Sequence, residues 1–270
     1  MMALASCQAM AMAHSPMRST RLSCVHESEI IPRELQVEPP REYWPTPLFW
    51  PINRHFEGLT AVSADPPVYV IDDLLDEATC EQLIEMASPH LQRSAVQTAA
   101  GYELDPRRTS SELRMAYDAV VEVQGRFSQL LAMPTTHFEP LKVSRYQAGE
   151  FFKFHHDCIP DGVEDGCAYC ETAWCNRVVT LFVYLRDCER GGETVFPNLN
   201  PPLEIQPRRG MGVLHFPARM PAGRGERDSR VGHAGAEAID EKYICQQWAW
   251  TGPLLRDELP ADMRSADMDA

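Results

Sequence analysis

Residues 151–157 read FFKFHHD, and this stretch is the most informative one in the chain. We expect it to form a strand. Side chains alternate between the two faces of a strand, so His155 and Asp157 point to one side and His156 points to the other. The His-x-Asp pair therefore offers an imidazole and a carboxylate to a single metal ion.

A metal bound by this pair needs a third ligand from elsewhere in the chain. The downstream candidates are His215 and His233, the second of which sits in a Gly-rich loop. Two histidines and one carboxylate on one face of a metal leave three positions open, which is the arrangement of non-haem Fe(II) oxygenases. A His-x-Asp pair also arises by chance in many chains, so the surrounding sequence is needed to judge whether this pair binds a metal.

Outward from this stretch, short strands follow one another at close spacing, separated by Gly, Pro and Asp turns. The expected strands lie at 138–146, 151–157, 177–185, 193–196, 203–206, 212–217 and 242–250, with an earlier one starting at Val68. Two amphipathic helices are expected over 76–90, with Asp76 as the N-cap, and over 117–132. This order predicts a mainly β, α+β fold, with helices buttressing one face of a sandwich or barrel.

From Val68 to Trp250 the chain resembles the prolyl 4-hydroxylase branch of the Fe(II)/2-oxoglutarate-dependent dioxygenases. The likeness is carried by VYVIDDLLDEATCEQLIEMA (68–87), LQRSAV (91–96), RRTSS (107–111), EPLKVSRYQAGEFFKFHHD (139–157), NRVVTLFVYLRDCERGGETVFP (176–197), IQPRRGMGVLHF (205–216), DSRVGHAG (228–235) and EKYICQQWAW (241–250). These stretches follow the family's order with similar spacing. The resemblance implies a double-stranded β-helix (jelly roll) core with buttressing N-terminal helices, which agrees with the expected strands.

Carried over position by position, the resemblance implies that His155, Asp157 and His233 bind the iron. His215, in the VLHF stretch, is then interpreted as a structural histidine, and His156 as a structural or supporting one. The carboxylate ligand favours hydroxylation, because related halogenases leave that position open for a halide.

For the cosubstrate, the resemblance implies that Lys242 pairs with the distal carboxylate of 2-oxoglutarate and that Tyr146 forms a hydrogen bond to it. Thr180, on the adjacent strand, is expected to line the same pocket. Gly191 and Gly192 are expected to make the tight turn before a strand, where a positive φ is needed.

The activity implied by the resemblance is an Fe(II)- and 2-oxoglutarate-dependent dioxygenation that consumes O₂ and releases succinate and CO₂. The expected substrate is a proline-containing peptide or protein, hydroxylated at the prolyl 4-position, with L-ascorbate keeping the iron reduced. Three alternatives stay open. They are an oxygenase of the same class acting on another residue or small molecule, a non-catalytic 2-oxoglutarate-fold binding module, and a zinc or redox module built on the cysteines.

The cysteines of the loop after Asp157 depart from the family pattern. Cys158, Cys167, Cys170 and Cys175 crowd into one segment, and the middle two have CxxC spacing. Free thiols, a disulfide and a zinc site are all compatible with this spacing, although zinc knuckles usually place two such pairs further apart. An odd total of nine cysteines in a chain of this length does not indicate a disulfide framework.

Composition excludes several classes of protein. The chain has 270 residues, 44% of them hydrophobic and 24% charged, which is ordinary for a globular protein and excludes a wholly disordered, collagen-like or coiled-coil chain. The net charge of −14 argues against a general nucleic-acid binder. No apolar run reaches the roughly 18 residues that a membrane-spanning helix needs. We expect a monomer or homodimer.

Four segments are expected along the chain. Residues 1–30 form a flexible or targeting segment, 31–65 a Pro-rich extended arm, 66–252 the dioxygenase domain and 253–270 an acidic tail. The cytoplasm is the favoured compartment. The Ala- and Met-rich start leaves organelle or endoplasmic-reticulum targeting as the alternative.

Overall fold

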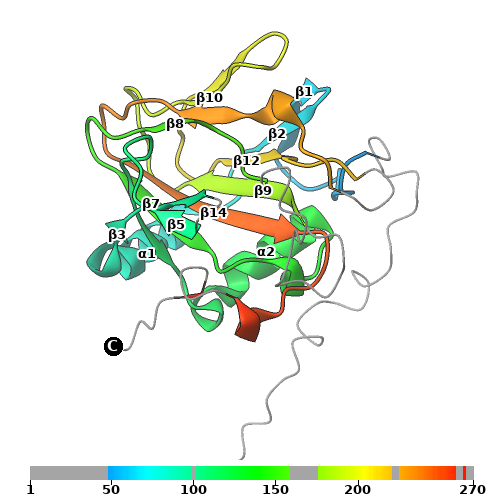
Figure 1. Ribbon diagram of the computed structural model, residues 1–270, viewed down its shortest axis with the longest axis horizontal. Coiled ribbons are helices and arrows are strands. Elements are labelled where there is room, and N and C mark those ends of the chain that lie inside the picture. Colours follow the sequence, from blue (N-terminus) through cyan, green and yellow to red (C-terminus); the bar gives the residue numbers. More distant parts are fainter. Residues whose placement is uncertain (1–47, 99–100, 159–175, 221–224, 260–263, 266–270) are drawn as a thin grey trace, which may run out of the picture.

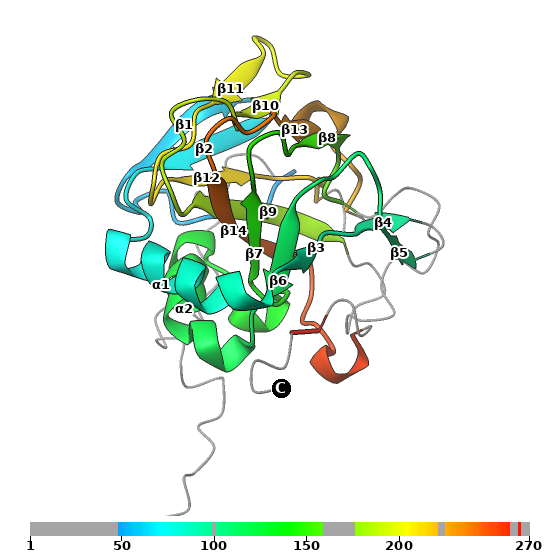
Figure 2. The same ribbon diagram turned by 90° about the vertical axis from the view of Figure 1, so that its left-hand side faces the viewer.

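Two β-sheets face each other, and two helices cover the outer face of the larger sheet (Figures 1 and 2). The structure is a computed structural model that describes residues 48–98, 101–158, 176–220, 225–259 and 264–265. The strands of the larger sheet run in the order β1-β2-β12-β9-β14-β7-β6-β3, and those of the smaller sheet in the order β11-β10-β13-β8. This is the jelly-roll arrangement that the sequence predicts, so the predicted fold class is confirmed.

The larger sheet contains β1 (Leu59–Ala64), β2 (Pro67–Ile71), β12 (Gly212–His215), β9 (Arg177–Tyr184), β14 (Lys242–Trp250), β7 (Lys142–Tyr146), β6 (Ser111–Arg114) and β3 (Gln92–Arg93). The smaller sheet contains β11 (Leu203–Ile205), β10 (Thr194–Phe196), β13 (His233–Gly235) and β8 (Phe152–His155). A separate hairpin pairs β4 (Val96–Thr98) with β5 (Gly101–Glu103), and the helices are α1 (Glu77–Ala87) and α2 (Val121–Leu131).

Strand β9 shows why the fold needs both layers. Every residue of this strand is buried, as expected for a strand with packed layers on both faces. Val179, Leu181 and Val183 belong to the core beneath the helices. Phe182 and Tyr184 alternate with them and belong to the core between the two sheets. The second core therefore places the inner face of β9 opposite the smaller sheet, where the functional side chains gather.

Both predicted helices are present. Asp76 caps α1, and its Oδ1 accepts a hydrogen bond of 2.7 Å from the backbone N–H of Thr79. The α-helix ends at Ala87, short of the predicted residue 90, because Pro89 follows and the chain continues as a 3₁₀ turn. The predicted helix over 117–132 starts as a 3₁₀ turn, Tyr117–Val120, and continues as α2.

Most predicted strands form at their expected places, and β14 has the predicted bounds. The strand expected over 138–146 begins only at Lys142, since Pro140 has no N–H to donate to a sheet. Strand β1 lies inside the range 31–65 that was predicted as an extended arm. It pairs with β2 at the sheet edge, and its largely exposed side chains carry no apolar alternation that would have revealed it.

Gly191 and Gly192 adopt φ values of 69° and 70° before β10, as predicted for a tight turn. The start of the segment 253–270 packs on the domain, because Leu254 and Leu259 are buried. The predicted segment 1–30 lies outside the described residues. Within the part of the chain that the structure describes, no helix is both long and apolar enough to cross a membrane.

Candidate metal and cosubstrate site

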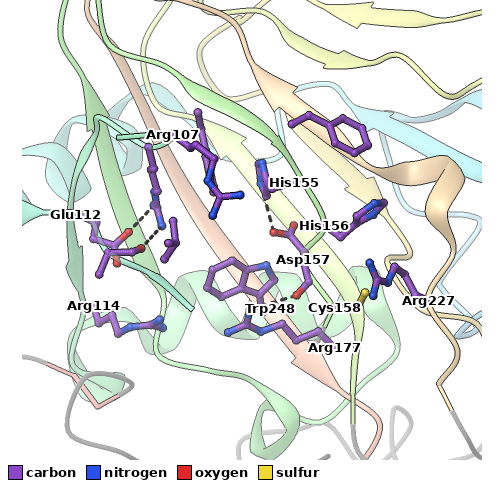
Figure 3. Close-up of a pocket in the computed structure, with 15 residues that line it drawn as sticks. Arg107, Glu112, Arg114, His155, His156, Asp157, Cys158, Arg177, Arg227 and Trp248 are labelled. Atoms are coloured by element: carbon purple, nitrogen blue, oxygen red, sulfur yellow. Dashed lines mark hydrogen bonds and ion pairs between the residues drawn. The ribbon is translucent and has the colours of Figure 1, made fainter. Parts of the chain in front are cut away.

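Two histidines and one aspartate meet between the two sheets. His155 ends β8 and His233 begins β13, and the two residues are direct partners in the antiparallel pairing of these strands. Asp157 follows His155 by two residues, so its carboxylate points to the same side (Figure 3). The candidate ligand atoms of the three residues all lie within 4.8 Å of one another. Long-range strand pairing thus brings together residues that are almost eighty positions apart.

The two imidazoles are held in the tautomer that a metal requires. Nδ1 of His155 lies 2.9 Å from the carbonyl oxygen of Lys153, and Nδ1 of His233 lies 3.2 Å from that of Val231. A carbonyl oxygen only accepts, so Nδ1 carries the hydrogen in each ring and Nε2 keeps a free lone pair. Burial lowers the pKa of His155 well below its usual range, which keeps this lone pair available.

Asp157 is an ionised carboxylate in this setting. Burial raises its pKa, but the charges around it, the buried Arg177 guanidinium among them, lower it below its usual range. Its Oδ2 accepts a hydrogen bond of 2.9 Å from Thr180 Oγ1 and a longer one of 3.5 Å from Gln246 Nε2. Its Oδ1 lies 3.6 Å from His155 Nε2. The donor set of two imidazoles and one carboxylate fits Fe(II).

His215 lies beside this group. Its Nε2 is 3.7 Å from Asp157 Oδ2, and its ring centroid is 4.8 Å from that of His233. It is not among the three residues whose ligand atoms converge. Burial lowers the pKa of His215 to about 3, so its ring is neutral. Its interpretation as a structural histidine stays a prediction.

Lys242 lines a narrow cavity that also reaches the two histidines. The lining side chains come from both sheets: Arg108, Tyr146, Phe152, His155, Phe182, Thr194, His233, Gly235, Lys242, Ile244 and Gln246. Lys242 Nζ donates a hydrogen bond of 2.5 Å to the carbonyl oxygen of Gly192 and forms no ion pair with any described carboxylate. Burial lowers its pKa to about 8. A buried lysine that has no acidic partner fits a ligand carboxylate.

The other predicted cosubstrate residues lie at different places. Tyr146 is the register partner of Lys242 on β7 and lines the same cavity. Thr180 is not among the lining residues, and its hydroxyl instead contacts Asp157. Its role at the cosubstrate stays a prediction. Thr194, which sequence reasoning missed, also lines this cavity and accepts a 2.8 Å hydrogen bond from Tyr184. It lies on a three-residue strand too short to show a face from sequence alone.

A second, wider cavity of about 330 Å³ is lined by His155 and Asp157 (Figure 3). Its walls mix aromatic and charged side chains: Ala95, Val96, Arg107, Arg108, Glu112, Arg114, Phe152, Phe154, His155, His156, Asp157, Cys158, Arg177, Arg227 and Trp248. Trp248 lies under two cations, with Lys142 Nζ and Arg177 Cζ each 3.8 Å from a ring centroid. Phe154 is 45% exposed at the rim, an apolar surface next to the metal ligands.

Buried ion pairs support the floor of this wider cavity. Glu139 is fully buried, and it binds Arg177 Nε at 2.6 Å and Arg114 Nη1 at 3.2 Å. It also accepts a 2.8 Å hydrogen bond from Trp250 Nε1. Burial raises the pKa of Glu139, but the two arginines outweigh burial and lower it. The sequence did not predict this network. For the wider cavity it predicted only that Trp248 shares a face of β14 with Lys242, because side chains alternate along a strand.

The cysteine cluster is described only in part. Cys158 lines the wider cavity and is buried. Cys167, Cys170 and Cys175 lie outside the described residues, so the alternatives for this loop stay open.

The fold and the site together define an Fe(II)- and 2-oxoglutarate-dependent oxygenase. A jelly roll holds a His-Asp-His group between its sheets, and a buried lysine lines an adjoining cavity. In agreement, residues 141–250 match the family model of the 2OG-Fe(II) oxygenase superfamily.

Comparison with individual proteins defines the family more narrowly. Probable prolyl 4-hydroxylase 3 of Arabidopsis thaliana is 30% identical over 225 residues, which cover 74% of this chain and 75% of that protein. Prolyl 4-hydroxylase 1 of the same plant is 28% identical over 208 residues, 69% of this chain and 70% of that protein. The viral collagen prolyl hydroxylase of Paramecium bursaria Chlorella virus-1, solved with 2OG, gives a TM-score of 0.52 at 25% identity over 68% of this chain and 95% of that chain. The chain belongs to the prolyl 4-hydroxylase family.

Proposed function

We propose that this protein hydroxylates prolyl residues of a peptide or protein substrate, with Fe(II), 2-oxoglutarate and O₂. The observation that carries the proposal is the position of the His-Asp-His group between two cavities. His155 and His233 line the narrow cavity together with Lys242, and His155 and Asp157 line the wider one (Figure 3). A cosubstrate and a peptide side chain can therefore reach one metal from separate directions. The names of the relatives support proline as the target.

In this proposal His155, Asp157 and His233 hold the iron through Nε2, one carboxylate oxygen and Nε2. When bound, iron and 2-oxoglutarate supply the oxidative chemistry that yields succinate, CO₂ and a hydroxylated product. The contribution of the chain is to position and shelter these groups. The carbonyl oxygens of Lys153 and Val231 fix the two rings, and Thr180 fixes the carboxylate.

Lys242 is proposed to bind the distal carboxylate of 2-oxoglutarate. Its ammonium group is buried and donates to a single described acceptor, so it retains hydrogens for a ligand. Tyr146, opposite it on β7, lines the same cavity and is proposed to form a hydrogen bond to the cosubstrate. A charge-assisted contact of this kind is stronger than a neutral hydrogen bond and fixes orientation.

The wider cavity is proposed to receive the substrate. Phe154 at its rim and Phe152 and Trp248 on its walls give apolar contacts for a pyrrolidine ring, and the arginines give donors for the peptide backbone. The catalytic unit is proposed to span 66–252. The pairing of β1 with β2 adds residues 59–64 to the same sheet.

The binding of 2-oxoglutarate should weaken with rising pH above about 8, the pKa to which burial lowers Lys242. Below this pH the ammonium is charged and binds the ligand carboxylate. Above it the free enzyme has to take up a proton on binding, so the affinity should fall towards tenfold per pH unit. Lys242→Gln should bind about 10- to 100-fold more weakly at pH 7, since a hydrogen bond to a charged group is lost.

Calorimetric titration of the Mn(II)-loaded protein at pH 7 to 9.5 measures both effects. The Lys242→Gln variant is the matched control, because it should show no such slope. Equal slopes in the variant and the unmodified protein would rule Lys242 out as the titrating group.

Succinate formation tests the function itself. Protein loaded anaerobically with Fe(II) should produce succinate from 2-oxoglutarate in air, with ascorbate present, and a proline-rich peptide should stimulate it. A peptide with alanine in place of proline is the control. Mass spectrometry should find 16 Da added to the proline peptide. Equal turnover with both peptides would retain the oxygenase and refute the prolyl substrate. Binding of 2-oxoglutarate without turnover would favour the non-catalytic binding module.

A further inference from the structure

His215 is a buried imidazole with no hydrogen bond. It lies on β12 with none of its surface exposed, and neither Nδ1 nor Nε2 has a hydrogen-bond partner in the described part of the chain. The rings of Phe196 and His233 lie beside it, with centroids 5.4 Å and 4.8 Å away. Burying a polar ring without a partner destabilises the folded chain, so an apolar side chain would suit packing better.

The strand register places this imidazole against the carboxylate of Asp157. His215 on β12 is the direct partner of Thr180 on β9, and directly opposite residues in an antiparallel pair share one face. Thr180 Oγ1 is 2.9 Å from Asp157 Oδ2, and His215 Nε2 is 3.7 Å from the same oxygen. His155 Nε2 lies 3.6 Å from the other oxygen, Oδ1, and His233 Nε2 lies 3.8 Å from Oδ2.

The two carboxylate oxygens of Asp157 therefore have different surroundings. Oδ2 already accepts hydrogen bonds from Thr180 and, at 3.5 Å, from Gln246. His215 and His233 also lie beside Oδ2, whereas Oδ1 lies beside the ligand histidine His155. A shift of about 0.8 Å would bring His215 Nε2 into ordinary hydrogen-bond distance of Oδ2. With His215 added to Thr180 and Gln246 as donors to Oδ2, Oδ1 would be left as the oxygen that binds the metal.

We propose that His215 is a positioning residue of the metal site, whose Nε2–H group donates to Asp157 Oδ2 and orients Oδ1 toward the iron. The proposal rests on the proposed iron site. It assigns a purpose to a side chain that packing alone does not explain. Partners that orient a metal ligand typically account for about 10- to 100-fold in metal affinity.

Two substitutions separate positioning from packing. His215→Phe fills the space beside Phe196 and removes both ring nitrogens, and His215→Gln retains an N–H donor. A packing role predicts that the metal-free His215→Phe protein unfolds at a lower temperature, with unchanged metal affinity. The positioning role predicts that the metal-free His215→Phe protein unfolds at the same temperature or higher, because an unpartnered polar ring is removed. It also predicts weaker metal binding, because the donor to Asp157 is lost.

Co(II) serves as the probe, because its visible absorption bands report binding and ligand geometry without turnover. We expect His215→Phe to bind Co(II) about 10- to 100-fold more weakly than the unmodified protein. Its metal-free form should unfold at the same temperature or higher. His215→Gln should recover the affinity to within about threefold and keep the band positions. If the Phe variant does not fold, His215→Leu takes its place.

Three results would overturn the proposal. The first is a His215→Phe protein that binds Co(II) as tightly as the unmodified protein. The second is a His215→Gln protein as weak as His215→Phe. The third is a change of band positions in both variants, which would make His215 a ligand rather than a positioning residue. Failure of the proposed iron site itself is distinguishable, because the unmodified protein and His155→Ala would then bind Co(II) equally.

Discussion

Replacing His155 with alanine should abolish the turnover of 2-oxoglutarate. The side chain supplies one of three converging ligand atoms, and its Nδ1 is already fixed by the Lys153 carbonyl. Loss of a partner that only supports a metal ligand costs about 10- to 100-fold in affinity or activity, so loss of the ligand itself should cost more than about 100-fold. Succinate formation and Fe(II) content of the purified protein measure the two consequences.

The variant should remain folded. The His155 side chain is 18% exposed at the end of β8, where it stacks on the ring of Phe152, so its removal opens no closed core cavity. His90→Ala is the control, since His90 is exposed in the 3₁₀ turn that follows α1. It should retain full turnover. Iron content and turnover of His155→Ala equal to those of the control would refute the metal site.

Local sequence patterns predicted the elements that are regular over many residues. The β14 strand has nine residues, all of them buried, and its predicted bounds were confirmed. The α1 helix combines a capping Asp76 with apolar side chains at helical spacing, and both signals are local. The pair of His155 and Asp157 could also be predicted to share a face, because strand alternation acts over three residues.

Long-range pairing explains what the patterns missed. Strand β13 has three residues, two of which flank an alanine, and it exists because β8 and β10 lie on its two sides. His233 was therefore placed in a loop by pattern and assigned to the iron only by resemblance. The partnership of Thr180 with Asp157 and the approach of His215 depend likewise on the register between strands, which no local period reveals.

The overall charge of the chain also gave no information about the charge of the site. The net charge is −14, yet the wider cavity has Arg108, Arg114 and Arg177 in its walls. Each of these arginines is buried against Glu112 or Glu139. The net charge sums over the whole chain, whereas the site depends on a few buried groups that β6, β9 and the segments before β6 and β7 bring together.

Replacing Glu139 with glutamine should lower the free energy of unfolding by about 3–5 kcal/mol, a large part of the stability of an ordinary domain. The substitution keeps the shape of the side chain and its hydrogen bond from Trp250, but it leaves Arg114 and Arg177 buried without a carboxylate. Removing one partner of a buried pair is costly because the remaining charge stays out of water. Urea unfolding at pH 7 measures the difference.

The matched control is Asp72→Asn, which breaks the ion pair between Asp72 and Arg208 at the surface. Their charged atoms lie 2.6 Å apart, as close as those of Glu139 and Arg177, but the two side chains are 52% and 60% exposed. This change should cost less than about 1 kcal/mol. Equal losses in the two variants would show that burial adds nothing to the Glu139 network.

Acid should diminish the difference between Glu139→Gln and the unmodified protein. The two arginines lower the pKa of Glu139 in the folded chain, so its contribution to stability is present above the unfolded value of 4.5. It is lost as the pH falls below that value and through the lower folded pKa, where the folded carboxylate also takes up a proton. The gap between the two unfolding curves should therefore narrow below about pH 4.5. A gap that stayed constant from pH 7 to pH 3 would mean that the network stabilises the fold by shape rather than by charge.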